Sequence, residues 1–317
     1  MATNTRVSYN HPSTREDLSD IIYNIDPTEV PFVTMASRLK ASNVLHEWQT
    51  ENLSAVDEDN AAIEGDDAQM SAPVNAVRIG NYTQISQKTV SVSGTDQATT
   101  QAGIKNAMAH QVALKGKELK RDMEAILLRN QARNAGSATA ARRLGGVPAF
   151  MVTNTNFGGG SGANPAGTGA NLGTTARVDG TQRAFEESQL LAMMRSAWTN
   201  GGNPNRVLMG PFNKERASGF TGIATKFKDV EDQRTIAAVD VFVSNFGEVM
   251  FVPNRFQRER DVFGLQSDMW GVAYLRPFFR KPLAHTGDRD SEQLIVEYTM
   301  VAKNEASSFM IADLTTA

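Results

Sequence analysis

The four histidines are the side chains of this sequence that could act as a general base or bind a metal ion. His11, His46, His110 and His285 lie far apart, and none belongs to a pair with the spacing of a zinc motif such as His-Glu-x-x-His. The chain contains no cysteine, which excludes disulfides, thiolate nucleophiles and cysteine-ligated zinc. We therefore predict no metal site and no histidine-based catalytic centre.

Glycine, serine and carboxylate patterns also give no indication of an active site. The segment 156–173 (NFGGGSGANPAGTGANLG) is rich in glycine, but no Gly-Lys-Ser/Thr follows it and no G-x-G-x-x-G opens a helix. No Gly-x-Ser-x-Gly elbow is present. The acidic pairs at 186–187 and 288–290 could do acid–base chemistry only in a shared cleft. We predict no catalytic residue, no cofactor-binding residue and no cofactor, so the protein is not expected to be an enzyme.

Acidic residues gather near the N-terminus. Residues 1–75 hold 4 Lys/Arg and 13 Asp/Glu, a net charge of −9, so the remaining residues carry +6 of the total of −3. Six of these acids fall within Asp57–Asp67 (DEDNAAIEGDD). This segment is interpreted either as a solvated loop or as a surface that pairs with basic residues of a neighbouring copy. It lacks the regular ligand spacing of a calcium-binding EF-hand loop.

The length of 317 residues allows one large domain or two smaller ones with a substantial core. No apolar run approaches the roughly 20 residues of a membrane span, and no secretion signal is recognisable at the N-terminus. We expect neither secretion nor residence in a membrane.

The first half of the chain predicts elements that lack a core of their own. Ser13-Thr14-Arg15-Glu16 is typical of a capping box, and Thr28 of a second helix cap, followed by Phe32, Met35 and Leu39. Strands are expected over 44–53 and 77–94, with the acidic segment between them. Together they would form an extended flap over 44–95, which needs a surface to lie on because an isolated hairpin is marginal in water.

The second half predicts a long helix and a compact mixed unit. Apolar residues recur at helical spacing over 104–134, where the many Lys and Arg residues form either a solvated face or a nucleic-acid-binding stripe. A helix over 181–200, a strand over 206–210 and a hairpin over 239–253 indicate an α/β-type unit within 140–280. Strands over 272–275 and 293–302 must then pair elsewhere, beside the long helix.

Several stretches, in order along almost the whole chain, resemble the major head protein family of tailed phages with the Hong Kong 97-like capsid fold. They are REDLSDIIYNIDPTEVPF (15–32), HEWQTENL (46–53), EGDDA (64–68), RIGNYTQISQKTVSVSGT (78–95), KGKELKRDMEAILLRNQA (115–132), GGNPNRVLMGPFNK (201–214), AVDVFVSNFG (238–247), VPNRFQRERDV (252–262) and VEYTMVAKNEAS (296–307). The resemblance implies an α+β fold with an N-terminal arm, an extended loop, a peripheral domain on a long spine helix, and an axial domain.

On that resemblance the arm is 1–43, the extended loop 44–95 and the axial domain 145–275. The peripheral domain is 96–144 with 276–317, and it contains the spine helix 104–134. Candidates for contacts between subunits are Trp48, Glu64, Asp66, Asp67, Tyr82, Lys88 and Arg121. Some shells of this fold form a Lys–Asn isopeptide bond. Lys88 has no matched acceptor here, so no covalent cross-link is expected, and neither is appreciable proteolytic trimming.

The resemblance also implies a function. Identical subunits would assemble as hexamers and pentamers into an icosahedral head shell, located in the virion and assembled in the host cytoplasm. Expected partners are a portal, scaffold or decoration proteins, and packaged double-stranded DNA held through non-specific contacts, with no membrane. Two alternatives stay open at this point: the shell of a bacterial encapsulated nanocompartment, and an α/β enzyme built on 140–280.

Overall fold

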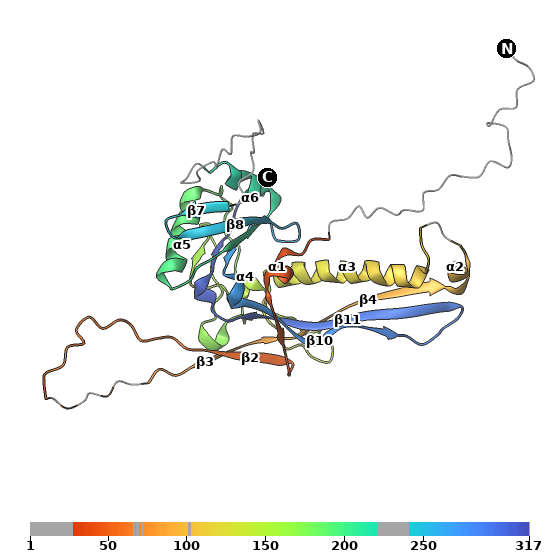
Figure 1. Cartoon of the computed structure of the whole chain (residues 1–317), viewed down its shortest axis with the longest axis horizontal. Helices are drawn as coiled ribbons and strands as arrows, with labels where there is room; N and C mark the ends of the chain where they lie inside the picture. The colour runs from red at the N-terminus through yellow and green to blue at the C-terminus, as the bar shows by residue number, and fades with distance from the viewer. Residues whose placement is uncertain are drawn as a thin grey trace, which may run out of the picture.

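The structure is a computed structural model with a four-stranded sheet, a six-stranded sheet and a two-stranded hairpin whose connecting loop projects from the molecule (Figure 1). The residues that it describes are 28–65, 67, 70, 73–100, 103–220 and 241–316. The helix expected to open at Ser13 lies outside these residues.

The four-stranded unit carries the long helix. Its strands in spatial order are β1 (Ser37–Lys40), β10 (Trp270–Pro282), β11 (Arg289–Ala302) and β4 (Gln84–Ser93). β1 is parallel to β10, and the other pairs are antiparallel. Helix α3 (Ala107–Leu127) runs along this sheet (Figure 1). The C-terminal strands therefore do pair beside the long helix, as expected from the sequence.

Helix α3 forms where the apolar periodicity predicted it, but it is shorter than the expected range 104–134. The side chain of Asn106 accepts a hydrogen bond from the Ala109 amide at 2.8 Å and caps the N-terminus. The helix ends at Leu127. Beyond it the backbone bonds to distant segments, with the Arg133 amide donating to the Gly173 carbonyl at 2.7 Å. Those tertiary bonds replace the last two helical turns that the periodicity suggested.

Strand β4 corrects the expected flap of 44–95. It pairs with β11 over its whole length, from Gln84 opposite Tyr298 to Ser93 opposite Arg289. Val90 and Val92 are buried beneath α3, while the alternate residues are exposed. The second strand of the flap therefore ends at Tyr82, because the two valines bury enough apolar surface to hold the following residues in the main sheet.

The projecting hairpin consists of β2 (Leu45–Thr50) and β3 (Val77–Tyr82). The two strands are antiparallel, with Leu45 opposite Tyr82 at the base and Thr50 opposite Val77 at the far end. Residues 51–76 join them, and we call this segment the extended loop. It reaches far beyond the rest of the molecule (Figure 1).

The six-stranded unit contains the second layer of helices. Its strands in spatial order are β5 (Thr155–Asn156), β12 (Phe309–Ile311), β9 (Val262–Leu265), β6 (Arg206–Met209), β8 (Gly247–Pro253) and β7 (Val241–Ser244). Helices α5 (Glu187–Thr199) and α6 (Pro211–Ser218) belong to this unit. The strand and hairpin predicted over 206–210 and 239–253 are confirmed, whereas α5 begins six residues after the expected start at 181, where Glu186 and Gln189 form a capping box.

The C-terminus also corrects an expected boundary. Strand β12 pairs with β9 and β5 inside the six-stranded sheet, and the Leu314 amide bonds to the Arg260 carbonyl at 3.0 Å. The final residues were expected in the unit of the long helix, as part of 276–317. They leave it after β11 because Phe309 and Ile311 fill the core of the six-stranded unit.

Short elements link these parts. They are α1 (Pro31–Met35), α2 (Gly94–Ala98), α4 (Val147–Phe150) and the 3-10 turns η2 (Gly169–Asn171), η3 (Ser267–Met269) and η4 (Glu305–Ser307). The prediction that Thr28 caps a helix extending to Leu39 is wrong. Helix α1 begins at Pro31, a residue suited to a first helical turn, and Leu39 lies in β1.

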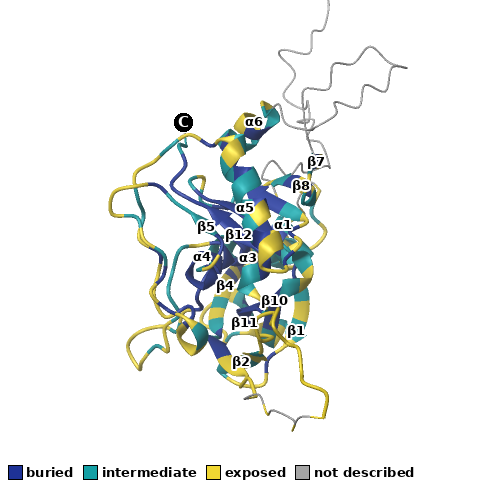
Figure 2. Cartoon of the chain, turned by 90° about the vertical axis from the view of Figure 1, so that its left-hand side faces the viewer, coloured by how far each residue is buried: buried dark blue, intermediate teal, exposed yellow. Residues whose placement is uncertain are grey.

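The described residues form two large apolar cores and one small cluster around Ala273. The larger core includes Phe32, Phe150, Trp270 and Tyr298, and it extends from α3 and the four-stranded sheet to Leu208 and Phe263 of the six-stranded sheet. The other large core fills the six-stranded unit beneath α5. Figure 2 shows this buried interior and, by contrast, an exposed chain beyond β2. The hairpin is part of this packed body, since Ile79 lies in the larger core and Trp48 packs against it, and the exposed chain begins at residue 51.

Candidate assembly surface

The base of the hairpin is fixed to the body by Asn81. Its side chain is fully buried, donates to the carbonyls of Gly145 (3.1 Å) and Met300 (3.0 Å), and accepts from the Gly145 amide (2.8 Å). Arg133 donates to the Gly80 carbonyl and, at 3.0 Å, to that of Ala170. Both Nδ2 hydrogens of Asn81 thus donate and its Oδ1 accepts, so the base of the hairpin is held in a defined position against the body.

Apolar side chains on the extended loop are exposed to solvent. Residues 51–65 and 73–76 are all exposed, as are Asp67 and Met70. Leu53 is 98% exposed, Val56 90%, Ile63 77% and Met70 100%. With Val74, which is 43% exposed, five large apolar side chains on this segment are exposed, which is unusual for a surface that meets only water.

The loop also carries charge of one sign. No Lys or Arg occurs between Lys40 and Arg78, whereas acids are frequent. Glu58 and Glu64 are exposed there, and Asp57 accepts a hydrogen bond from the Asp59 amide at 3.0 Å. A surface of exposed apolar groups among acids is complementary to a partner with apolar patches and basic residues.

The contact candidates named from the sequence fall into two groups. Glu64 and Asp67 lie on the exposed loop, while Asp66 lies outside the described residues. Trp48 is half-buried on β2 and packs on Phe150, with ring centroids 6.1 Å apart. Tyr82 is half-buried at the base of β3.

Lys88 and Arg121 make contacts within the chain. The Lys88 ammonium lies 2.8 Å from Asp122 and 3.9 Å from Glu118, both on α3. The guanidinium of Arg121 lies over the ring of Phe256, 5.9 Å from its centroid. Lys88 is thus not on the hairpin, where the sequence analysis placed it, because β4 belongs to the main sheet.

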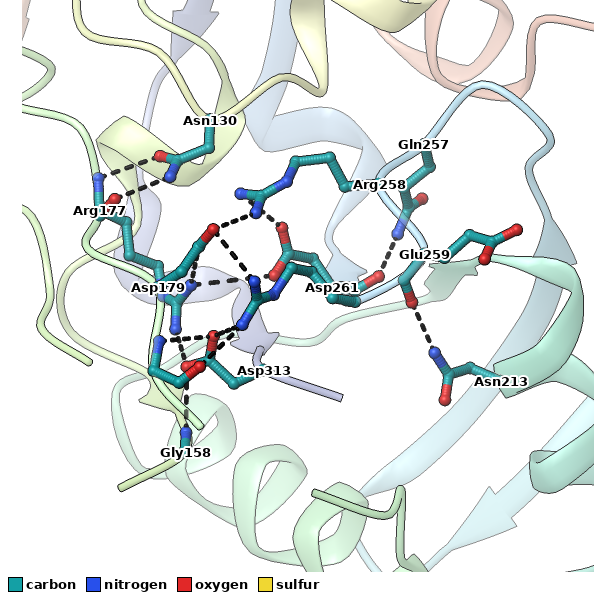
Figure 3. A network of polar contacts seen from close by, with 12 residues as sticks. Asn130, Gly158, Arg177, Asp179, Asn213, Gln257, Arg258, Glu259, Asp261 and Asp313 are labelled. Atoms are coloured by element: carbon teal, nitrogen blue, oxygen red, sulfur yellow. Dashed lines mark hydrogen bonds and ion pairs between the residues drawn. The ribbon is translucent and has the colours of Figure 1, made fainter. Parts of the chain in front are cut away.

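A network of ion pairs that the sequence analysis did not predict joins three segments of the chain beside the six-stranded sheet (Figure 3). We call it the Asp313 network, and its members are Arg177, Asp179, Arg258, Arg260, Asp261 and Asp313. They come from three segments far apart in the sequence. Three carboxylates face three guanidinium groups, so the charges balance inside the chain.

Asp313 is the centre of the network. It is fully buried, pairs with Arg177 and Arg260, and accepts hydrogen bonds from the amides of Gly158 (3.1 Å) and Gly180 (2.9 Å). Its φ is 59°, in the left-handed region that few residues other than glycine adopt. Burial raises the pKa of Asp313, but the Gly180 amide and Arg177 outweigh it, and the pKa lies below its usual value.

In Asp261, by contrast with Asp313, the effect of burial on the pKa outweighs that of the neighbouring arginines. Its carboxylate is completely buried, 3.2 Å from Arg258 and 4.0 Å from Arg177. Neither oxygen has a hydrogen-bond partner in the described part of the chain. Burial raises the pKa of Asp261 to about 6, against the lowering effect of Arg258 and Arg177.

A second buried carboxylate, Glu124, lies at the junction of three segments. One oxygen accepts from the Phe32 amide (2.8 Å) and from Asn254 Nδ2 (2.6 Å), and the other accepts from the Val33 amide (2.9 Å). Burial raises the pKa of Glu124, although these three hydrogen bonds oppose the effect. The carboxylate therefore joins α1, α3 and the segment after β8.

Within the described ranges, no group of three or more His, Asp or Glu side chains could hold a metal ion. His285 lies 3.0 Å from Asp290, but both side chains are exposed, and burial lowers the pKa of His46 on β2. No described helix is long and apolar enough to cross a membrane.

The fold matches those of solved capsids. The chain superposes on the cyanophage A-1(L) capsid asymmetric unit with a TM-score of 0.63 and 14% identity, covering 96% of this chain and 98% of that one. It superposes on the capsid protein of a native GTA particle with a TM-score of 0.62 and 11% identity, covering 99% of this chain and 100% of that one. The protein therefore has the Hong Kong 97-like capsid fold expected from its sequence.

The family is defined by the sequence comparison. The model of the SU10 major capsid protein family matches residues 1–315, and the chain belongs to this family. The major capsid protein of Escherichia phage Phieco32 is 27% identical over 334 residues, covering 95% of each chain. The protein is thus a major capsid protein that forms the icosahedral head shell of a tailed phage and is located in the virion.

Proposed function

We propose that the extended loop is the main surface by which one subunit holds the next in hexamers and pentamers of identical copies. The observation that carries this proposal is the exposure of Leu53, Val56, Ile63 and Met70 on a segment that its own chain does not cover. Burial of such side chains contributes roughly 1.5–3 kcal/mol each, and the gain is repeated at every contact in a shell.

The charge of the loop also supports a second copy of this chain as its binding partner. The loop contains acids and no Lys or Arg, and residues 76–317 carry a net charge of +6. A neighbouring copy can supply the basic surface that the loop lacks. Glu64, Asp66 and Asp67 remain our contact candidates there. Trp48, Tyr82, Lys88 and Arg121 would act less directly, by fixing the hairpin and the sheet from which it projects.

We assign the remaining roles by position. The four-stranded unit with α3 would be the peripheral domain, and the six-stranded unit with β12 the axial domain around the capsomer centre. We infer a structural role, which the membership in a major capsid protein family supports. A portal, scaffold or decoration proteins and packaged double-stranded DNA would complete the head, which we expect to assemble in the host cytoplasm without a covalent cross-link.

Expression of the chain alone tests assembly directly. Size-exclusion chromatography and electron microscopy should show capsomers, sheets or closed particles. A monodisperse monomer under every assembly condition would contradict the proposal.

Loop variants test the surface. We expect Leu53→Ser with Ile63→Ser to reduce the assembled fraction at least tenfold while leaving the circular dichroism spectrum and melting temperature of the unassembled chain unchanged. Val178→Ser, which alters a valine 51% exposed outside the loop, is the matched control and should assemble normally. Equal assembly of both variants would exclude the loop as the main contact.

A further inference from the structure

Glu124 connects parts of the chain that are separate in sequence and in fold. Phe32 and Val33 belong to α1, 92 and 91 residues away, and Asn254 follows β8, 130 residues away. The carboxylate is completely buried on α3. Its hydrogen bonds therefore connect α1, through the long helix, to the six-stranded unit.

Both ends of this connection are themselves held firmly. Phe32 is fully buried and packs edge-on against Trp270, with ring centroids 6.4 Å apart. The Asn254 amide donates to the Met209 carbonyl of β6 at 2.8 Å, and its side-chain oxygen accepts from the Phe256 amide at 2.9 Å. Because one Glu124 oxygen receives both the Phe32 and the Asn254 hydrogens, a shift of either donor alters the geometry of the other.

The cost of breaking the connection is asymmetric. A buried carboxylate that loses a donor keeps its desolvation penalty, which makes partial loss worse than complete replacement. The three donors are therefore expected to be kept together or released together. Joint release is what a two-state element shows, whereas independent contacts would be lost one at a time.

We propose that Glu124 is a coupling residue that links the docking of α1 to the position of the six-stranded unit, so that α1 and residues 254–256 open and close as one. The joint gives the arm end of the subunit a direct mechanical connection to its other end. It is separate from the extended loop, and its failure would leave the proposed assembly surface standing.

Hydrogen exchange of the full-length chain tests the joint at a distance. Asn254→Ala alters a residue that does not bond to α1, yet it should accelerate exchange of the Phe32 and Val33 amides at least about tenfold, the equivalent of one charge-assisted hydrogen bond. Asn213→Ala is the matched control. Asn213 is equally buried and donates to the Glu259 carbonyl at 2.6 Å within the six-stranded unit. Equal α1 exchange in the two variants would overturn the proposal.

The reciprocal variant keeps the test decisive if Asn254→Ala does not fold. Glu124→Gln preserves size and one acceptor oxygen but removes the charge and the second acceptor. It should accelerate exchange of the Asn254 and Phe256 amides together with those of Phe32 and Val33, while amides around Leu190 in α5 change less than threefold. Acceleration confined to α1 would reduce Glu124 to a local helix cap and refute the coupling.

Discussion

The extended loop and the Asp313 network are both rich in aspartate, but only the network contains arginines alongside its acids. In the network, Asp179, Asp261 and Asp313 face Arg177, Arg258 and Arg260 across distances of at most 4.0 Å. In the loop, no Lys or Arg accompanies the acids between Lys40 and Arg78.

The difference shows which charges serve the fold and which serve assembly. A buried charge must be paired within the chain, because water no longer solvates it. An exposed charge can remain solvated until a partner arrives. The network therefore determines the shape of one subunit, and the loop is suited to recognise the next one.

Loss of Asp313 should have the largest effect on stability. Asp313→Ala removes the buried carboxylate that pairs with Arg177 and Arg260 and leaves the Gly158 and Gly180 amides without their acceptor. We expect unfolding free energy to fall by roughly 3–5 kcal/mol in chemical denaturation of the unassembled chain. Asp179→Ala is the control, since that side chain is 36% exposed and should cost much less. Similar losses for both would mean that burial does not set the strength of the network.

Asp261 should give the network a distinct pH dependence. Its folded pKa of about 6 lies above the unfolded value of 3.8, so the folded chain binds this proton more tightly. Its contribution to stability is most favourable below the unfolded pKa and declines as the pH rises through the folded pKa of about 6, by about 3 kcal/mol in all.

Comparison with Asp261→Asn isolates this contribution. The stability difference between the variant and the wild type should change by about 2 kcal/mol between pH 4 and pH 6, in favour of the variant at the higher pH. Denaturation curves at four pH values across the window measure it. A constant difference would show that Asp261 does not titrate there.

Lys88 provides an intermediate case, since its pair is half-exposed. Lys88→Met removes the contacts with Asp122 and Glu118 but keeps the aliphatic stem on the sheet. We expect a loss of at most about 1 kcal/mol, reduced further by salt. Thermal unfolding at low and high ionic strength measures both effects, and a loss of several kcal/mol would place this pair with the buried network.

Neutralising the loop should have the smallest effect on stability. Glu58→Gln with Glu64→Gln is expected to change the unfolding free energy by less than about 0.5 kcal/mol. The same variant should weaken assembly and make it less dependent on salt, as followed by light scattering. Destabilisation without an assembly defect would reverse the roles that we give to the two regions.

Much of the secondary structure could be predicted, because it depends on residues close in sequence. The periodicity of Leu119, Met123 and Leu127 identified α3, and the asparagine–glycine turn region at 245–247 identified the β7–β8 hairpin. The exposed acidic loop could also be located. The end of α3 could not, since it is set by the bond from Arg133 to Gly173.

The buried charged residues could not be predicted from the sequence either, because most of their partners lie far away along the chain. The stretch from Arg258 to Asp261 shows mixed charges, which are typical of a solvated loop as well as of a network. Asp313 stands alone among apolar residues near the C-terminus, with its Gly158 partner 155 residues away. Asn81 and Glu124 likewise resemble ordinary surface residues until their partners are placed.

The sequence by itself determined the local preferences of this protein: its helical and strand periodicities, the absence of cysteine and metal motifs, and a run of acids without a base. The tertiary structure alone decided that β4 joins the main sheet, that the C-terminus closes the six-stranded unit, and which acids are neutralised. The reason is physical: burial and pairing depend on residues brought together from distant parts of the chain, and the energy of a charge depends on its surroundings more than on its neighbours in sequence.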